Sequence, residues 1–167
     1  MRKHCIAPVA AAVMLAVAGS AQAATKTANL NVSAAVASNC FITTTPLTFA
    51  DYDGTANVDA TGTVSVRCSK GNSYVLSLNG GTTLGGTIAQ RLLAGPLGDT
   101  LQYNLYTTAA RNVIWGDGTT GSTQGATGTG LGNSVPYTVF GRVPFNATND
   151  GAGVGAYSDV VTATVSY

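Results

Sequence analysis

The chain has 167 residues, of which 45% are hydrophobic and only 9% are charged, and its formal net charge is +1. This length suits a single domain and is sufficient to bury a hydrophobic core. So sparse a set of charges offers no patch of clustered lysine and arginine, which excludes a nucleic-acid-binding protein.

The first 23 residues have the three parts of a secretory signal peptide. Positive charge at residues 2–3 precedes an apolar run over 6–17, and small residues then mark a cleavage site between Ala23 and Ala24. An uncleaved N-terminal anchor is the alternative, but the apolar run is short and no stop-transfer pattern follows it. We therefore predict cleavage and export of the remaining 144 residues through the periplasm to the cell surface or the extracellular space.

Cleavage would remove the single histidine and leave a chain with neither histidine nor glutamate. Serine–histidine–aspartate triads, cysteine–histidine pairs and most metal sites need these residue types. Seven aspartates remain, and two carboxylates can in principle cleave a glycosidic bond. However, Asp53, Asp117 and Asp150 each precede glycine, where a turn explains them better. We expect no enzyme, no cofactor and no metal site.

A period of two in the apolar residues dominates the exported chain and predicts β-strands. Runs rich in β-branched and aromatic residues occupy 63–68, 73–78, 101–107, 137–143 and 160–167. Turn pairs such as Asp-Gly and Asn-Gly separate them, which favours an antiparallel sandwich. A turn or two of helix is expected within residues 87–93. The tract 116–132, rich in glycine, threonine and serine, predicts a long exposed loop that is either mobile or an interaction site.

Two cysteines remain after cleavage, Cys40 and Cys68, and export carries them to a compartment where disulfides persist. A zinc site is the competing interpretation, but two cysteines without histidine cannot complete the zinc ligand set. We predict a disulfide between them. It closes a loop of about 29 residues and stabilises the fold by roughly 3 to 4 kcal/mol in the chain-entropy model.

One further alternating run lies in an unusual position, between the expected cleavage site and Cys40. Its apolar face consists of Ala28, Leu30, Val32, Ala34 and Val36. As a strand it would extend over roughly 27 Å, which is enough to cross a sandwich. Periodicity alone leaves two possibilities open: it is the first strand of the domain's own sheet, or it pairs elsewhere.

Several sequence blocks together carry a resemblance to a known family. They are the Cys40–Cys68 spacing and the segments 101–107, 115–118, 139–144 and 155–167. The chain resembles the spore coat protein U domain family, which includes the pilins of archaic chaperone-usher pili. The likeness covers essentially the whole exported chain.

The resemblance implies an all-β fold, an incomplete immunoglobulin-like antiparallel sandwich that lacks its last strand and has a hydrophobic groove in its place. It implies a signal peptide over 1–23, an N-terminal donor-strand extension over 24–38 and a pilin domain over 39–167. Family pilins are held by a periplasmic chaperone and polymerise at an outer-membrane usher, where the extension of one subunit fills the groove of the next. The positions that match the donor role are Ala28, Leu30, Val32, Ala34 and Val36.

Physical arguments support this implication. The final apolar run, 161–167, ends the chain with no further strand after it, and an unpaired sheet edge needs a partner. Burying one leucine and two valines would contribute about 5 to 8 kcal/mol before ordering costs. Because such a contact does not close on itself, repeated copies form a filament. The donor run lacks the inward glycine of many pilins, so either Ala28 or Ala34 would be its small residue and the register stays open.

The leading hypothesis is a structural subunit of a pilus or fimbria that serves adhesion and biofilm formation. Its partners would be copies of itself or related pilins, the chaperone and the usher. The alternative is a secreted coat or matrix protein that is not assembled into pili, a role that the family's coat-forming member keeps open. A third hypothesis is a tip adhesin that binds a receptor through loops such as 116–132, but 144 residues leave no room for the separate receptor-binding domain that tip proteins usually carry.

Overall fold

The computed structural model describes residues 22–167. The chain divides into two units, Met1–Ala35 and Val36–Tyr167. Residues 22–35 of the first unit form no regular secondary structure, and their side chains are exposed. The expected signal peptide falls almost entirely on residues 1–21, outside the described part. Among the described residues, no helix has the length and apolarity needed to cross a membrane.

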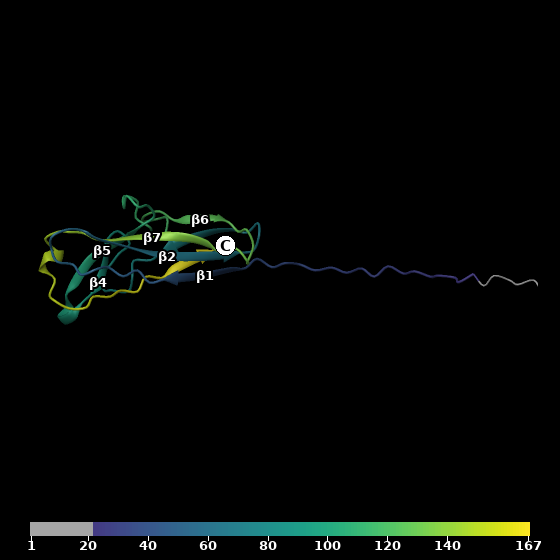
Figure 1. The fold of residues 1–167 in the computed structure, drawn as a ribbon, viewed down its shortest axis with the longest axis horizontal. Helices are drawn as coiled ribbons and strands as arrows, with labels where there is room; N and C mark the ends of the chain where they lie inside the picture. Colours follow the sequence, from purple (N-terminus) through teal and green to yellow (C-terminus); the bar gives the residue numbers. More distant parts are fainter. Residues whose placement is uncertain (1–21) are drawn as a thin grey trace, which may run out of the picture. The chain divides into compact units, whose positions relative to one another are not determined.

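The second unit is an all-β sandwich of two antiparallel sheets (Figure 1). Within residues 22–167 there are eight strands: β1 (Cys40–Thr45), β2 (Val58–Cys68), β3 (Ser73–Leu78), β4 (Arg91–Ala94), β5 (Thr100–Tyr106), β6 (Gln124–Thr127), β7 (Val135–Val143) and β8 (Ala163–Ser166). Two 3₁₀ turns, Pro96–Gly98 and Asn149–Gly151, lie between strands. The larger sheet has the order β1-β2-β7-β5-β4, and the smaller has the order β6-β3-β8.

The hydrophobic core lies between the two sheets and is built from the inward residues of alternating strands. Its buried members are Val64, Val66, Cys68, Tyr74, Leu76, Leu78, Leu101, Tyr103, Leu105, Trp115, Val139 and Val143. Trp115 is fully buried, and its indole N–H donates a 3.2 Å hydrogen bond to the carbonyl of Leu76. The period of two predicted from the sequence is therefore the alternation between this core and the outer faces.

A fully buried arginine links the two sheets inside the core. Arg91 on β4 donates hydrogen bonds to the side-chain oxygen of Asn104, at 2.6 Å, and to the carbonyls of Trp115, at 2.8 Å, and Asn79, at 2.9 Å. Burial lowers the pKa of Arg91, yet its ordinary value is high enough for the side chain to stay charged. Because its donors are satisfied, the buried charge joins the sheets without leaving unpaired polar atoms.

The disulfide expected from the sequence is present. Cys40 and Cys68 are direct partners in the register of β1 and β2, and their sulfurs are bonded. Next to it, the backbone N–H of Ser69 donates to the carbonyl of Asn39 at 2.9 Å, and the Asn39 N–H donates to the Ser69 hydroxyl at 3.1 Å. The bridge therefore holds the point at which residues 36–39 enter the sandwich.

The structure confirms the all-β class, corrects two local expectations and shows that residues 28–36 are not a strand of the domain's own sheet. Residues 87–93 are not helical, because Thr87 and Gln90 bond across a turn and β4 then pairs with β5. The tract 116–132 is not entirely a loop, since β6 within it pairs with β3. Residues 28–36 form no strand in the described structure. A strand exists only with a neighbour to share its hydrogen bonds, so alternation alone does not produce one.

Candidate functional site: an open apolar groove

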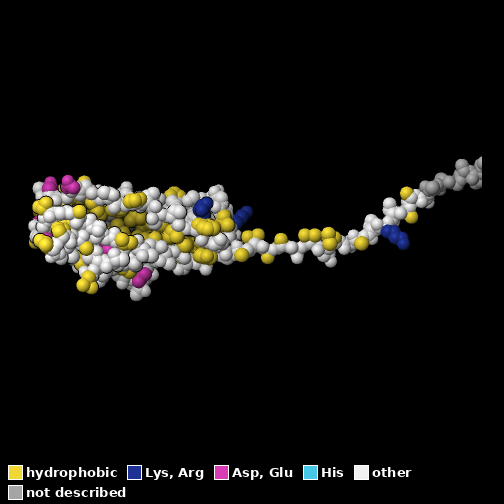
Figure 2. All heavy atoms as spheres, turned by 90° about the horizontal axis from the view of Figure 1, so that it is seen from below, with side chains coloured by type: hydrophobic (Ala, Val, Ile, Leu, Met, Phe, Trp, Pro, Cys, Tyr) yellow, Lys and Arg dark blue, Asp and Glu magenta, His cyan; other side chains and the backbone are white. Residues whose placement is uncertain are grey.

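A groove with a volume of about 960 Å³ opens into the sandwich between the two sheets. This size lies at the upper end of the range for small-molecule pockets, roughly 300 to 1,000 Å³. Figure 2 shows hydrophobic side chains gathered in a strip along one face of the domain. The groove is therefore large enough to take several side chains in a row.

The floor of the groove is the core itself. Residues that are at most 7% exposed also line the groove: Val64, Leu78, Leu101, Tyr103, Leu105, Val139 and Val143. In a closed sandwich such side chains would be covered by another strand of one of the sheets. Here the groove reaches these core side chains from one side of the sandwich, where no further strand of the described residues covers it.

The first wall is formed by residues 46–52, which follow β1. Leu47 and Phe49 are half-buried and alternate with exposed neighbours, and the Phe49 ring meets Tyr103 edge-to-face with centroids 6.1 Å apart. The wall can lie close to the sheet because Gly141 on β7 has no side chain. A Cβ at Gly141 would lie only 2.9 Å from atoms of both Leu47 and Phe49.

The second wall is the chain that leads into β8. Its half-buried residues alternate in the manner of one strand face: Tyr157, Asp159, Val161, Ala163 and Val165. β8 pairs with β3 along one edge, and within residues 22–167 no strand pairs with its other edge. In the same described range, β1 pairs with β2 alone. The two strands that flank this side of the sandwich therefore each have a free edge.

A polar contact crosses the floor between the walls. The Tyr103 hydroxyl donates a 2.7 Å hydrogen bond to Oδ2 of Asp159, and Oδ1 accepts the backbone N–H groups of Thr82, at 2.8 Å, and Thr83, at 3.0 Å. Burial alone would raise the pKa of Asp159, but these hydrogen bonds, that of Tyr103 foremost, lower it below its usual value. Burial, followed by the bond to Asp159, raises the pKa of Tyr103. At neutral pH the pair is a fixed carboxylate and a neutral phenol, which links β5 to the second wall and to residues 82–83 after β3.

The chemistry of the groove is that of a binding surface for an extended apolar segment. Alternate side chains of such a segment would fill the floor, and its backbone would pair with a free strand edge. Among the described residues, no group of three or more histidine, cysteine or acidic side chains is placed to hold a metal ion. The lining is mainly aliphatic and aromatic, with Asp51 and Asp159 as its carboxylates.

The residues predicted for the donor role are exposed in the structure. Leu30, Val32 and Val36 are 87%, 84% and 92% exposed, and Ala28 and Ala34 are exposed as well. Sequence reasoning found Val161 and its alternating neighbours but missed the first wall. The signal for that wall was the alternation of Leu47 and Phe49 directly after β1, too short a run to be recognised by itself.

Three comparisons with known proteins bear on this arrangement. The sequence profile of the Spore Coat Protein U domain matches residues 26–164. "Protein U" of Myxococcus xanthus is 35% identical over 181 residues, covering 99% of this chain and 98% of that protein. The chain also resembles a solved chain in the CsuC-CsuE chaperone-tip adhesion subunit pre-assembly complex from the archaic chaperone-usher Csu pili of Acinetobacter baumannii.

The structural likeness has a TM-score of 0.57 at 21% identity and covers 79% of this chain but only 40% of the solved one. It shows the fold, an incomplete immunoglobulin-like sandwich with a groove along its open side. The profile match over most of the chain and the 35% identity to a relative of similar length show the family. The chain therefore belongs to the Spore Coat Protein U domain family.

Proposed function

We propose that the chain is a structural subunit of a surface pilus or fimbria, in which the N-terminal extension of one copy fills the groove of the next. The observation that carries this proposal is the open core between two free strand edges. The same chain contains an exposed run with the alternation that such a groove accepts. Strand addition of this kind obtains affinity from backbone hydrogen bonds and specificity from alternate side chains.

The proposed donor residues fit this role in length and chemistry. Residues 28–36 would extend over roughly 27 Å as a strand. Inserting Leu30, Val32 and Val36, which are now exposed, would bury enough apolar surface to contribute about 5 to 8 kcal/mol before ordering costs. Because the donor and the groove are different surfaces of one chain, the contact repeats without closing, and the product is a filament.

The route of assembly follows from the same surfaces. An unfilled groove leaves the core open and would promote aggregation, so a chain in transit needs a partner that covers it. We propose a periplasmic chaperone in that role, followed by an outer-membrane usher. The solved complex of a chaperone with a pilus subunit of similar fold supports the first of these. Export suits the Cys40–Cys68 disulfide, and filaments on the cell surface would serve adhesion and biofilm formation. The proposed role is structural and not enzymatic.

A second candidate function is that of a secreted coat or matrix protein. The observation that favours it is the likeness to Protein U of Myxococcus xanthus, together with the spore coat in the family's description. This candidate differs in its assembly. A coat protein that does not use the groove would be a stable monomer or a non-filamentous aggregate, indifferent to an added donor segment.

The test compares three forms of the chain beginning at residue 24: unaltered, with residues 24–38 deleted, and with Leu30→Asp and Val32→Asp. We expect filaments by negative-stain microscopy from the first form alone. A synthetic peptide of residues 24–38 should bind the double variant and raise its melting temperature, whereas a peptide with the same two aspartates should not. The double variant keeps the full chain length, so a folding failure of the deletion does not affect the result.

Filaments from the double variant, or a domain that ignores the unaltered peptide, would contradict donor-strand exchange. Indifference to the peptide combined with a stable monomer would favour the coat candidate instead.

A further inference from the structure

One end of the sandwich carries two exposed basic residues. Arg67 is the second-last residue of β2, and Lys70 lies in the turn to β3, on either side of the disulfide-bonded Cys68. The guanidinium of Arg67 lies over the Phe41 ring, 5.3 Å from its centroid, which holds the charge against the surface. We call Arg67 and Lys70 the basic end. It surrounds the point at which residues 36–39 enter the domain.

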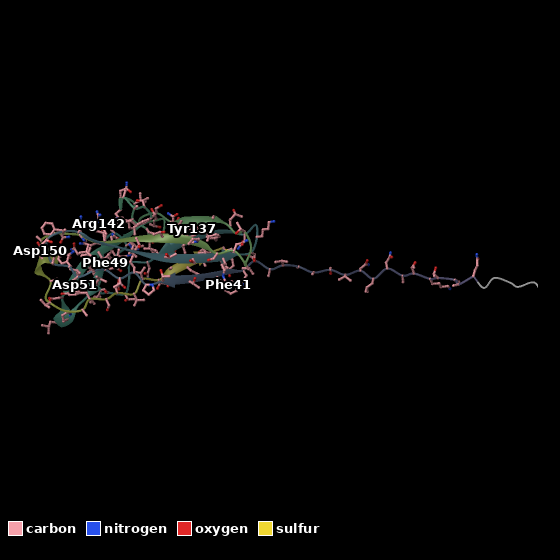
Figure 3. All side chains as sticks on the ribbon, in the orientation of Figure 1. Phe41, Phe49, Asp51, Tyr137, Arg142 and Asp150 are labelled. Carbon is pink, nitrogen blue, oxygen red and sulfur yellow. A yellow bond between two sulfur atoms is a disulfide. The ribbon has the colours of Figure 1, made fainter. Side chains whose placement is uncertain are left out.

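The opposite end carries four carboxylates, those of Asp51, Asp53, Asp99 and Asp150, which we call the acidic end. Asp150 accepts a 2.6 Å hydrogen bond from the hydroxyl of Tyr52, and Asp99 accepts one of 3.0 Å from the N–H of Gly153. Figure 3 places Asp51 and Asp150 at the end of the sandwich opposite to Phe41. The 11 residues of β2 lead from one end to the other and correspond to about 33 Å.

The charges of these two ends are not neutralised within the domain. Among residues 22–167, the ion pairs join Arg111 and Arg142 to Asp59, at 3.2 and 2.7 Å. Neither the basic end nor the acidic end takes part in one. Figure 2 shows the result on one face, with Lys and Arg side chains at one end of the domain and Asp side chains at the other. The domain therefore has two ends of opposite charge.

The acidic end is also one mouth of the groove. Asp51 lines the groove directly, and Tyr52 and Gly153, the hydrogen-bond partners of Asp150 and Asp99, line it too. A segment leaving the groove at this mouth must pass these carboxylates. The hydrogen bonds of Asp150 and Asp99 to groove-lining residues therefore place the acidic end beside the groove.

The chain between the donor run and the domain is short. Val36 is the last inward residue of the run, and Cys40 follows four residues later, a span of at most about 14 Å. If Val36 lies at the mouth of a neighbour's groove, the basic end of its own domain lies within about that distance of the neighbour. A span of about 14 Å is the limit for a fully extended link, and a less extended link brings the facing charges within the Debye length of about 8 to 10 Å at physiological salt, where they interact.

We infer that the two ends form a second contact between consecutive copies, in which Arg67 and Lys70 of one copy face the acidic end of the next. The inference rests on the proposed function, because the extension brings the ends together. A segment can enter a groove in either direction. One direction brings the basic end to the acidic mouth, and the other brings two basic ends together, so the charges select the first. Exposed charge pairs of this kind act on association rate and specificity more than on affinity.

The test uses the full chain from residue 24 at low and high salt, with assembly followed by light scattering. An acidic-end variant carries Asp53→Asn and Asp150→Asn, because these two carboxylates of the acidic end do not line the groove. A control variant carries Thr61→Lys and Thr138→Lys on the exposed side of β2 and β7, which changes the net charge by the same amount. A reversal pair completes the set: Asp53→Lys with Asp150→Lys, alone and combined with Arg67→Asp and Lys70→Asp.

We expect the acidic-end variant to assemble about tenfold more slowly than the control at low salt, and the difference to shrink as salt rises. The reversed acidic end should slow assembly further, and the combined reversal should restore much of the rate. Binding of the 24–38 peptide should change much less than the assembly rate, because the peptide lacks Arg67 and Lys70 and Lys26 is its one charged side chain.

Equal rates for the acidic-end and control variants, with peptide binding intact, would overturn this inference and leave the proposed function standing. A failure of the peptide to bind the domain would overturn the proposed function, and with it the contact that depends on it.

Discussion

Tyr103 on β5 and Asp159, four residues before β8, are joined by a 2.7 Å hydrogen bond at the floor of the groove. The Oδ1 atom of the same carboxylate accepts the N–H and hydroxyl groups of Thr82 and Thr83. Asp159 is therefore held from two directions, and the second wall of the groove is held with it. This pair connects the opening of the groove to the stability of the domain.

Replacing the phenol should destabilise the domain. Tyr103→Phe removes one hydrogen bond to an ionised acceptor, and we expect a loss of about 1.5 to 3 kcal/mol in the free energy of unfolding. Urea unfolding followed by the fluorescence of Trp115, the single tryptophan, measures it. Tyr106→Phe is the matched control, because the Tyr106 hydroxyl has no side-chain hydrogen bond within the described residues, and it should cost less than about 0.5 kcal/mol. Equal losses would show that the bond does not stabilise the domain.

Stability should fall in acid. Hydrogen bonds from Tyr103 and the threonines hold the pKa of Asp159 low despite its burial, and the bond from Arg142 foremost lowers the pKa of Asp59. A carboxyl with a depressed folded pKa stabilises the fold above its unfolded value of about 3.9, and this contribution is lost as the pH falls through the folded pKa. The free energy of unfolding should be nearly flat from pH 7 to 5 and fall below about pH 4. Asp159→Asn should make that fall shallower, and an unchanged acid slope would count against the assignment.

The disulfide should be a main contributor to stability. The double variant Cys40→Ser, Cys68→Ser removes a bridge with a sequence separation of 28, and we expect a loss of about 3 to 4 kcal/mol. Reductant should destabilise the unaltered chain by a similar amount and have no effect on the variant. A chain that is insensitive to reductant would contradict a stabilising role of the bridge.

The first wall of the groove should depend on Gly141. A side chain there must displace Leu47 and Phe49, because even a Cβ would lie 2.9 Å from both. Overpacking typically costs about 1 to 3 kcal/mol of stability, so Gly141→Val should lower the free energy of unfolding by about that amount, and the displaced wall should weaken binding of the 24–38 peptide. Gly132→Ala is the control, since nothing lies within 4 Å of its Cβ position. Identical peptide affinities in the two variants would show that this wall does not contact the donor.

Strands were predicted well from the sequence where apolar and polar residues alternate within one segment. Residues 73–78 were expected as a strand and have those bounds as β3, and the run 137–143 forms most of β7. The same prediction missed β1, and it failed for β4 and β6, which are four residues each and have little pattern. Strands β4 and β6 form because they pair with the edges of β5 and β3. The residues of a short strand do not themselves indicate whether such an edge lies beside it.

By itself, the sequence determined the all-β class, the family resemblance and the cysteine pairing. It could do so because alternation is local, and because only two cysteines follow the expected cleavage site. Only the tertiary structure decided where the core stays open. The groove is made by Leu47 and Phe49 on one side and by Tyr157, Asp159 and Val161 on the other, more than a hundred residues later. Their approach depends on the order of strands in the two sheets and on the missing side chain of Gly141, so it appears only when the whole sandwich is folded.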